Sequence, residues 1–406
     1  MLACWPAEAA VSLVVLCLSA LPVSAHSEAR RVPRYYRLTN LGARIHGPST
    51  AYAISDSGLV AGNAAGRSDR SNENYEENFS ISDPIAPDRP VDSIVGVLWR
   101  RGIPHRLGAG SGYAGCYVTD VNSSGQVAGN LDTSFNGAYM GTHESGFIWH
   151  RGNYDTLSGG GYMDSEAYAI NNSGEVAGAW VYSAATGPDD SYIDHAMLWR
   201  HDIAQDLGEG HATCINAEGD VAGCTVMVGP TGRPMGNAIT VPDSDMYADA
   251  WLWRHGKRVV IGSGRPNGIN DSGQIVGVTS PHKSGEAVVD WGRAVLWQLR
   301  MATDLGTLGG RESSAASINN LGQIVGWARD TKQAKHAFLW ENGRMYDLNG
   351  LVRSHRGWIL EQASCINNHG CIVGWGWHGG AECAFLLTPE GTKKARIEPF
   401  ITHRNS

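Results

Sequence analysis

The sequence predicts an all-β fold, a seven-bladed β-propeller of four-stranded blades. Three observations support this prediction. A nine-residue phrase occurs seven times, a strand ending in tryptophan follows six of the copies, and a lone strand near the N-terminus matches a strand missing at the C-terminal end. Repeats of roughly 45–50 residues with strand-like content are typical of propellers and solenoids.

The repeated phrase reads as a tight β-hairpin. One copy is Ile-Asn-Asn-Leu-Gly-Gln-Ile-Val-Gly at residues 318–326. The other copies occupy residues 54–62, 121–129, 170–178, 215–223, 269–277 and 366–374. Their central glycines are 67, 49, 45, 54, 49 and 48 residues apart. The glycine supplies the positive φ of a short turn, and the polar residue that opens the turn, usually Asn, bonds to the turn backbone. Two copies match the N-glycosylation pattern, at Asn122-Ser123-Ser124 and Asn270-Asp271-Ser272, but turn chemistry explains both.

Each full unit is predicted to contain four strands. The first leads into the hairpin, the second returns from it, the third ends in tryptophan and the fourth contains Asp-Leu. The third-strand tryptophans are Trp99, Trp149, Trp199, Trp253, Trp297 and Trp340. Fourth-strand segments include residues 205–208, 303–306 and 346–348. A large ring at the same place in each unit favours packing between blades over ligand binding.

The two ends of the chain complement each other. The seventh unit reaches its third strand at residues 385–387, where Leu387 replaces tryptophan, and then has no good fourth strand. A lone strand at residues 35–41 precedes the first hairpin. Pairing this strand with the last blade would close the ring and remove two exposed sheet edges. We therefore expect a single propeller domain over residues 35–388, with blade seven completed by 35–41, and a C-terminal tail over 389–406.

Residues 1–25 resemble a secretory signal peptide. An apolar stretch at residues 11–21 precedes Val23-Ser24-Ala25, a small-residue cleavage pattern. The first ten residues contain Glu8 and no Lys or Arg, which departs from the usual signal, so a membrane anchor or a misassigned start are the alternatives. No later stretch is apolar enough to cross a membrane. We expect a soluble mature protein that is secreted or periplasmic.

Composition narrows the classes of partner. The formal net charge of -8 argues against a nucleic-acid surface, and we expect a monomer. Six cysteines follow the signal segment: Cys116, Cys214, Cys224, Cys365, Cys371 and Cys383. Cys214 with Cys224, and Cys365 with Cys371, flank hairpins and are candidates for disulfides. Buried thiols are an equally good interpretation.

Parts of the repeat resemble a known family. His336-Ala337-Phe338-Leu339-Trp340, the segment at residues 304–310 and the repeated hairpin resemble the bacterial HAF-repeat extracellular proteins. The closing run, from Asp347-Leu348-Asn349 to Gly357-Trp358 and then residues 384–389, is similar to the usual end of such proteins. The resemblance covers nearly everything after residue 34 and is degenerate in units one and four. It implies secretion and a repeat β fold, and it implies no activity, because the family has no established reaction.

The predicted binding surface lies at the ends of the blades opposite the hairpins. Loops that join strands two and three are long in units one to five, and the largest cover residues 67–93, which are acidic, and 225–249. Variable loops and aromatic rings on a rigid scaffold usually carry binding of sugars or peptides. The candidate aromatics are Trp180, Tyr182, Tyr192, Tyr247, Trp291, Trp327, Trp375 and Trp377. The alternatives are that these rings plug the blade ends and that the 67–93 insert is disordered.

The sequence predicts no cofactor and gives little support to catalysis. Two loose carboxylate clusters are weak candidates for Ca²⁺: Asp189, Asp190 and Asp194, and Asp243, Asp245 and Asp249. No nucleophile elbow, His-Glu-x-x-His motif or P-loop occurs. We predict a binding or interaction module for a glycan or a peptide. A polysaccharide hydrolase or lyase is one alternative, and a structural surface repeat protein is another.

Overall fold

The computed structural model describes residues 35–390 apart from 46, 67–92, 109–114, 133–143, 158–162, 183–193, 202, 227–246, 280–281, 285–286, 291, 299–300 and 355–356. These residues belong to one compact unit, Arg34–Ser406. The predicted signal peptide, most of the 67–93 and 225–249 loops and the C-terminal tail from 391 lie outside the described residues. Within them, no helix has the length and apolar character needed to span a membrane.

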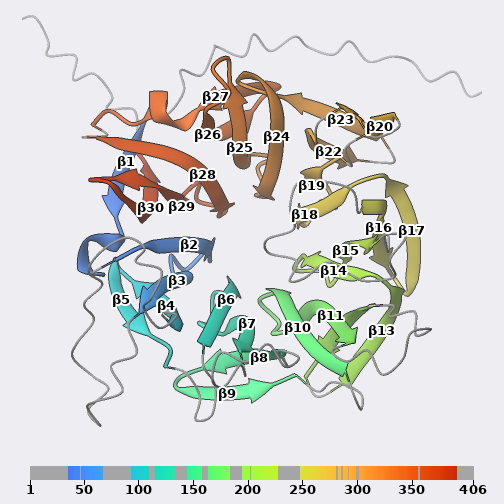
Figure 1. Cartoon of the computed structure of the whole chain (residues 1–406). Coiled ribbons are helices and arrows are strands. Elements are labelled where there is room, and N and C mark those ends of the chain that lie inside the picture. Colours follow the sequence, from blue (N-terminus) through green and yellow to red (C-terminus); the bar gives the residue numbers. More distant parts are fainter. Residues whose placement is uncertain are drawn as a thin grey trace, which may run out of the picture. The chain divides into compact units, whose positions relative to one another are not determined.

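The described chain is an all-β protein built from four-stranded antiparallel sheets (Figure 1). The first sheet contains β2 (Ser49–Ile54), β3 (Val60–Gly66), β4 (Ser93–Arg100) and β5 (Ile103–Arg106). The second set of four strands is β6 (Gly115–Val121), β7 (Val127–Asp132), β8 (Glu144–His150) and β9 (Asn153–Thr156). The third set of four strands is β10 (Met163–Ile170), β11 (Val176–Tyr182), β12 (His195–Arg200) and β13 (Ile203–Glu209). A single parallel pairing of Ser165 with Ser145 joins these two sets into one eight-stranded sheet.

The remaining sheets repeat the pattern. One contains β14 (His211–Ile215), β15 (Val221–Val226), β16 (Tyr247–Arg254) and β17 (Lys257–Gly262), and the next contains β18 (Arg265–Ile269), β19 (Ile275–Val278), β22 (Ala294–Gln298) and β23 (Met301–Gly306). Another contains β24 (Gly309–Ile318), β25 (Ile324–Asp330), β26 (Lys335–Glu341) and β27 (Arg344–Asp347). A small extra hairpin, β20 (His282–Ser284) with β21 (Ala287–Asp290), lies in the connection expected to be a loop. The helices are short 3-10 turns, η1 (Gly42–Arg44) and η2 (Leu348–Leu351).

The last sheet combines both ends of the described chain. Its strands are β28 (Trp358–Ile366), β29 (Ile372–His378), β30 (Ala381–Pro389) and β1 (Tyr36–Asn40). β1 pairs antiparallel with β30, with Tyr36 opposite Pro389 and Asn40 opposite Phe385. The lone N-terminal strand thus supplies the fourth strand of this sheet.

All seven copies of the repeated phrase form the predicted hairpin. In each turn, the backbone amide of the opening residue donates to the carbonyl of the residue four positions later. The glycine amide donates to the carbonyl of the opening residue, as Gly322 N does to Asn319 O at 3.0 Å. Gly322 has a φ of 75°, as a three-residue hairpin loop requires at that position. The side-chain Oδ1 of Asn319 accepts from the amides of Leu321 (3.1 Å) and Gln323 (3.0 Å). Turn chemistry therefore accounts for the asparagines, and Asn122 and Asn270 are both buried.

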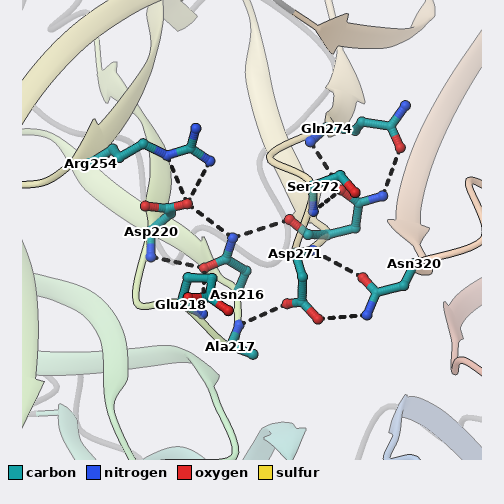
Figure 2. Close-up of polar contacts among 10 residues, drawn as sticks. Asn216, Ala217, Glu218, Asp220, Arg254, Asp271, Ser272, Gln274 and Asn320 are labelled. Atoms are coloured by element: carbon teal, nitrogen blue, oxygen red, sulfur yellow. Dashed lines mark hydrogen bonds and ion pairs between the residues drawn. The ribbon is translucent and has the colours of Figure 1, made fainter.

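The turn asparagines also connect neighbouring hairpins. Figure 2 shows one junction: Asn216 Nδ2 donates to the carbonyl of Asn270 (3.1 Å), and the amide of Ala217 donates to Asp271 Oδ1 (3.0 Å). The same side-chain bond to the next turn recurs from Asn122, Asn171, Asn270, Asn319 and Asn367. The last of these runs from Asn367 in the final hairpin to Ser55 in the first, at 3.0 Å.

A β-bulge recurs in the first strand of each sheet. The bulged residues are Tyr52, Thr119, Tyr168, Thr213, Asn267, Ala316 and Ser364. Beside it, the second strand carries glycine because the strands approach closely: a Cβ on Gly326 would lie 2.0 Å from Ser314 O, and one on Gly374 would lie 2.0 Å from Gln362 O. This contact explains the glycine that ends each repeated phrase.

The hydrophobic core lies between successive sheets. Of the third-strand residues, Trp99, Trp149, Trp199, Trp253, Trp297 and the replacing Leu387 are buried, which supports the packing role predicted for this position. Trp340 is half-buried and packs against a core cluster. One cluster combines Trp99 and Ala51 of the first sheet with Val373 and Ala384 of the last. The described cysteines are all thiols, not disulfides. Cys214 lies opposite Ala222 and Cys224 opposite His211, so this candidate pair is offset in register.

Candidate functional site

Two of the predicted binding aromatics meet around a lysine. The ammonium nitrogen of Lys335, the first residue of β26, lies 4.8 Å from the ring centroid of Trp327 and 5.0 Å from that of Trp375. Lys335 Nζ also donates a 2.9 Å hydrogen bond to Gln362 Oε1. These four residues, which we call the tryptophan–lysine cluster, come from β25, β26, β28 and β29 and bridge two neighbouring sheets. An ammonium between two indole rings is a cation–π arrangement.

Exposed apolar side chains lie beside this cluster. Trp377 is 43% exposed and its cross-strand neighbour Ile359 is 50% exposed. Both are near the ends of β28 and β29 that lie away from the hairpin turn at residues 367–371. Within the described part of the chain, the Trp377 side chain makes no hydrogen bond or ring contact. This is the blade end at which binding was predicted.

Two carboxylates complete the surroundings of the cluster. Glu361 is the bulged residue between Leu360 and Gln362 in β28, and Glu382 is the cross-strand neighbour of Trp377 in β30. Burial raises the pKa of Glu382, the Glu361 carboxylate raises it further, and the Lys335 ammonium lowers it. Neither carboxylate has a hydrogen bond or an ion pair within 4.0 Å among the described residues. Lys335, Gln362 and both glutamates were not predicted from the sequence, because each belongs to a different strand from the tryptophans.

The other predicted aromatics do not join this cluster. Trp180 is half-buried and packs against a core cluster that includes Trp199 and Met197, so it serves the core. Only the backbones of Tyr182 and Tyr247 are described, and Tyr192 and Trp291 lie outside the described residues.

The predicted calcium clusters find no support within the described chain. Asp189, Asp190, Asp243 and Asp245 lie outside it. Asp194 is buried and pairs with a histidine, whereas Asp249 is exposed. The described residues contain no group of three His, Cys, Asp or Glu side chains placed to hold a metal ion.

A second polar cluster is buried between β10 and β14. Nε2 of His211 lies 2.8 Å from Asp194 Oδ2, and its Nδ1 lies 3.0 Å from the Tyr168 hydroxyl, which also bonds to Glu166. The imidazole stacks on the Tyr168 ring, with centroids 5.7 Å apart. Glu166, Asp194 and His211 are 6%, 8% and 9% exposed, and Tyr168 is half-buried. We call these four residues the histidine–tyrosine cluster.

The hydrogen bonds of this cluster fix where its protons can be. The Asp194 carboxylate accepts from His211 Nε2, and the Tyr168 hydroxyl has one proton for two neighbours. It donates that proton to the Glu166 carboxylate. Burial raises the pKa of Glu166, whereas the hydrogen bond from Tyr168 and the nearby His211 lower it.

The sequence held a weak signal for this cluster. Glu166 and Tyr168 are the polar positions in a strand segment otherwise rich in alanine, Glu166-Ala167-Tyr168-Ala169. Their joint position was not predictable from alternation, because the bulge at Tyr168 shifts the register between Ala167 and Ala169. Asp194 Oδ1 is buried without a hydrogen-bond partner among the described residues.

Comparison with known proteins supports the fold class alone. No protein-family model matches the chain, and no curated protein matches it. The structure is similar to the β-propeller domain of the Trilobed protease from Pyrococcus furiosus, with a TM-score of 0.52 and 8% identity over 88% of this chain and 95% of that chain. It is also similar to a puromycin-hydrolyzing peptidase of Mycobacterium tuberculosis, with a TM-score of 0.50 and 11% identity over 89% of this chain. The match spans 55% of that peptidase, so it extends over about half its length. At these identities the likeness indicates a β-propeller fold and carries no information about activity.

Proposed function

We propose that this chain is a secreted or periplasmic seven-bladed β-propeller that binds a glycan or a peptide at the blade ends opposite its hairpin turns. The seven-bladed closed ring is supported by the seven hairpins, by the pairing of β1 with β30 and by the bond from Asn367 to Ser55. The core cluster that contains residues of both the first and the last sheet also supports closure of the ring.

The tryptophan–lysine cluster carries the binding proposal. Two indole rings, an amide, an ammonium and two carboxylates without ion-pair partners lie together beside the exposed Trp377. The fold does not need the Trp377 ring for packing at the 43% of its surface that is exposed. Aromatic rings with nearby polar groups are common in sites that bind glycans and peptides. The other end of the sheets consists of tight turns whose polar groups bond to one another.

A combined glycan and peptide array tests this proposal. The parent protein is compared with Trp377→Ala and with the matched control Ile203→Ala, which removes a 72% exposed side chain from the outer strand β13. We expect the parent and the control to bind the same probes and Trp377→Ala to lose at least fivefold in affinity, since an exposed ring contact is worth about 1 kcal/mol. If all three proteins bind equally well with unchanged melting temperatures, the surface around Trp377 is not the site.

Export and family membership are part of the same proposal. The supporting features are the apolar segment at residues 11–21, the small-residue pattern at 23–25 and the resemblance to HAF-repeat proteins. Fusion of residues 1–30 to a reporter enzyme that folds only outside the cytoplasm tests export. An inactive fusion, beside an active one with a known signal peptide, would contradict it.

One observation favours a second candidate function, a hydrolase or lyase acting on polysaccharide. The histidine–tyrosine cluster presents a half-buried phenol backed by a buried His, Glu and Asp, which are residue types used in general acid–base catalysis. Assays of a polysaccharide panel for new reducing ends and for unsaturated products, with the parent and Tyr168→Phe, test this function. Turnover that disappears in Tyr168→Phe supports it, and turnover of no polysaccharide contradicts it.

A further inference from the structure

The exposed pair Trp377 and Ile359 lies in a negatively charged setting. Glu382 is directly across the strands from Trp377, and Glu361 is close enough to Glu382 to raise its pKa. Cross-strand neighbours have Cβ atoms about 5 Å apart, so the Glu382 carboxylate can reach a group that lies on the Trp377 ring. Neither glutamate forms an ion pair with a described cation, and the Lys335 ammonium, which bonds to Gln362, is close enough to lower the pKa of Glu382.

The tryptophan–lysine cluster demonstrates a way to hold a cation on this surface. Lys335 places its ammonium against two indole rings and gives its hydrogen bond to an amide oxygen. Trp377 and Glu382 place an indole and an oxygen acceptor on adjacent strands in the same way, and no described cation lies on the Trp377 ring. A carboxylate adds attraction that the amide of Gln362 does not supply.

We propose that the ligand of this surface is a peptide segment carrying an Arg or Lys side chain. Its cationic group lies on the Trp377 ring and pairs with the Glu382 carboxylate, Glu361 adds attraction, and its aliphatic stem contacts Ile359. This inference rests on the proposed binding function and commits it to one ligand class. A neutral sugar would leave the repulsion between the two carboxylates offset by Lys335 alone, whereas a second cation relieves it further. The formal net charge of -8 also favours the approach of a basic segment.

Fluorescence polarisation with defined probes tests the inference. The probes are labelled hexa-arginine, hexa-lysine and hexa-glutamate peptides and a labelled neutral cello-oligosaccharide. The proteins are the parent, Trp377→Ala, Trp377→Phe, Glu382→Gln, and Glu218→Gln as a matched control from an exposed hairpin turn. Melting temperatures are measured for each, so that a loss of binding is not confused with a loss of fold.

We expect the parent and Glu218→Gln to bind the basic peptides and not the acidic one. Glu382→Gln should weaken binding about tenfold and Trp377→Ala about fivefold, with Trp377→Phe in between, and the Glu382 effect should shrink as salt increases. Binding of the neutral oligosaccharide alone, lost in Trp377→Ala and kept in Glu382→Gln, overturns this inference and leaves the proposed function intact. If no probe shows binding that depends on Trp377, both fail.

Discussion

Replacing Asn319 by alanine tests whether the hairpin turns hold neighbouring sheets together. Asn319 is 3% exposed, and its side chain makes four hydrogen bonds. Two come from the amides of Leu321 and Gln323, one goes to Gln323 Oε1 at 2.8 Å, and one goes to the Asn367 carbonyl of the next turn at 3.0 Å. The substitution removes all four bonds and leaves the buried Asn367 carbonyl with one bond fewer.

The expected loss follows from these bonds. At roughly 1 kcal/mol net for each hydrogen bond the sum is about 4 kcal/mol, and water that reaches the exposed turn at Leu321 recovers part of it, which leaves about 3 kcal/mol. The matched control is Leu321→Ala in the same turn, whose side chain is 70% exposed and whose loss should cost less than about 1 kcal/mol. Asn319→Ser should lie between them, because Ser55 in the first turn keeps one such bond, from the Leu59 amide at 3.2 Å.

Urea unfolding followed by tryptophan fluorescence, together with melting temperature, measures the effect. An Asn319→Ala protein that is no less stable than Leu321→Ala would contradict the expected loss. A loss of the expected size with an unchanged dependence on urea would indicate that the junction stabilises the whole fold, whereas a new separate transition would indicate that one sheet detaches.

Three further predictions follow from the same contacts. Ser55→Asn should stabilise the protein by about 1 kcal/mol in urea unfolding, because it supplies the donor to the Asn122 carbonyl that the first turn lacks. A chain that begins at Gly42 loses β1 and exposes the β30 edge, so it should unfold less cooperatively and aggregate in light scattering; a transition as sharp and as late as that of the parent would contradict this. Burial raises the pKa of Asp120 from 3.8 to about 6, so the folded state holds its proton more tightly than the unfolded state. Stability should therefore fall by about 2 kcal/mol as pH rises from 4 to 6, and Asp120→Asn should remove this slope in unfolding measured across that range.

The sequence predicted the features of the fold that are local or periodic. The hairpin turn is set by residues within five positions of one another, such as Asn319, Gly322 and Gln323, and their hydrogen bonds match the expectation. The pairing of β1 with β30 was predictable although the strands lie far apart in sequence, because the repeat defines what a complete unit contains and one strand was missing. The core position of the third-strand tryptophans followed from their recurrence at one place in six of the seven units.

Contacts between sheets were not predictable in this way. The second role of the turn asparagines, the bond to the next hairpin, depends on how two sheets sit side by side. Lys335 looked like an ordinary polar residue before His336-Ala337-Phe338, and its position between two tryptophans depends on strands from two units. Tyr168 occupies a bulge, where the alternation that assigns strand faces does not hold.

The two ends of the sheets differ in how completely their side chains are used. At the hairpin turns, the side chains of Asn319 and its counterparts form hydrogen bonds within their own turn and to the next turn. Few of their donors and acceptors are therefore left to bind a ligand. At the opposite end of the last sheet, Trp377 is exposed, and Glu361 and Glu382 lack ion-pair partners among the described residues. Like charges held together cost stability, and an indole that is 43% exposed gains less from packing than a buried one, so these residues oppose what stability alone would favour. This contrast between the two ends of the sheet supports the proposed binding surface at the end opposite the hairpin turns.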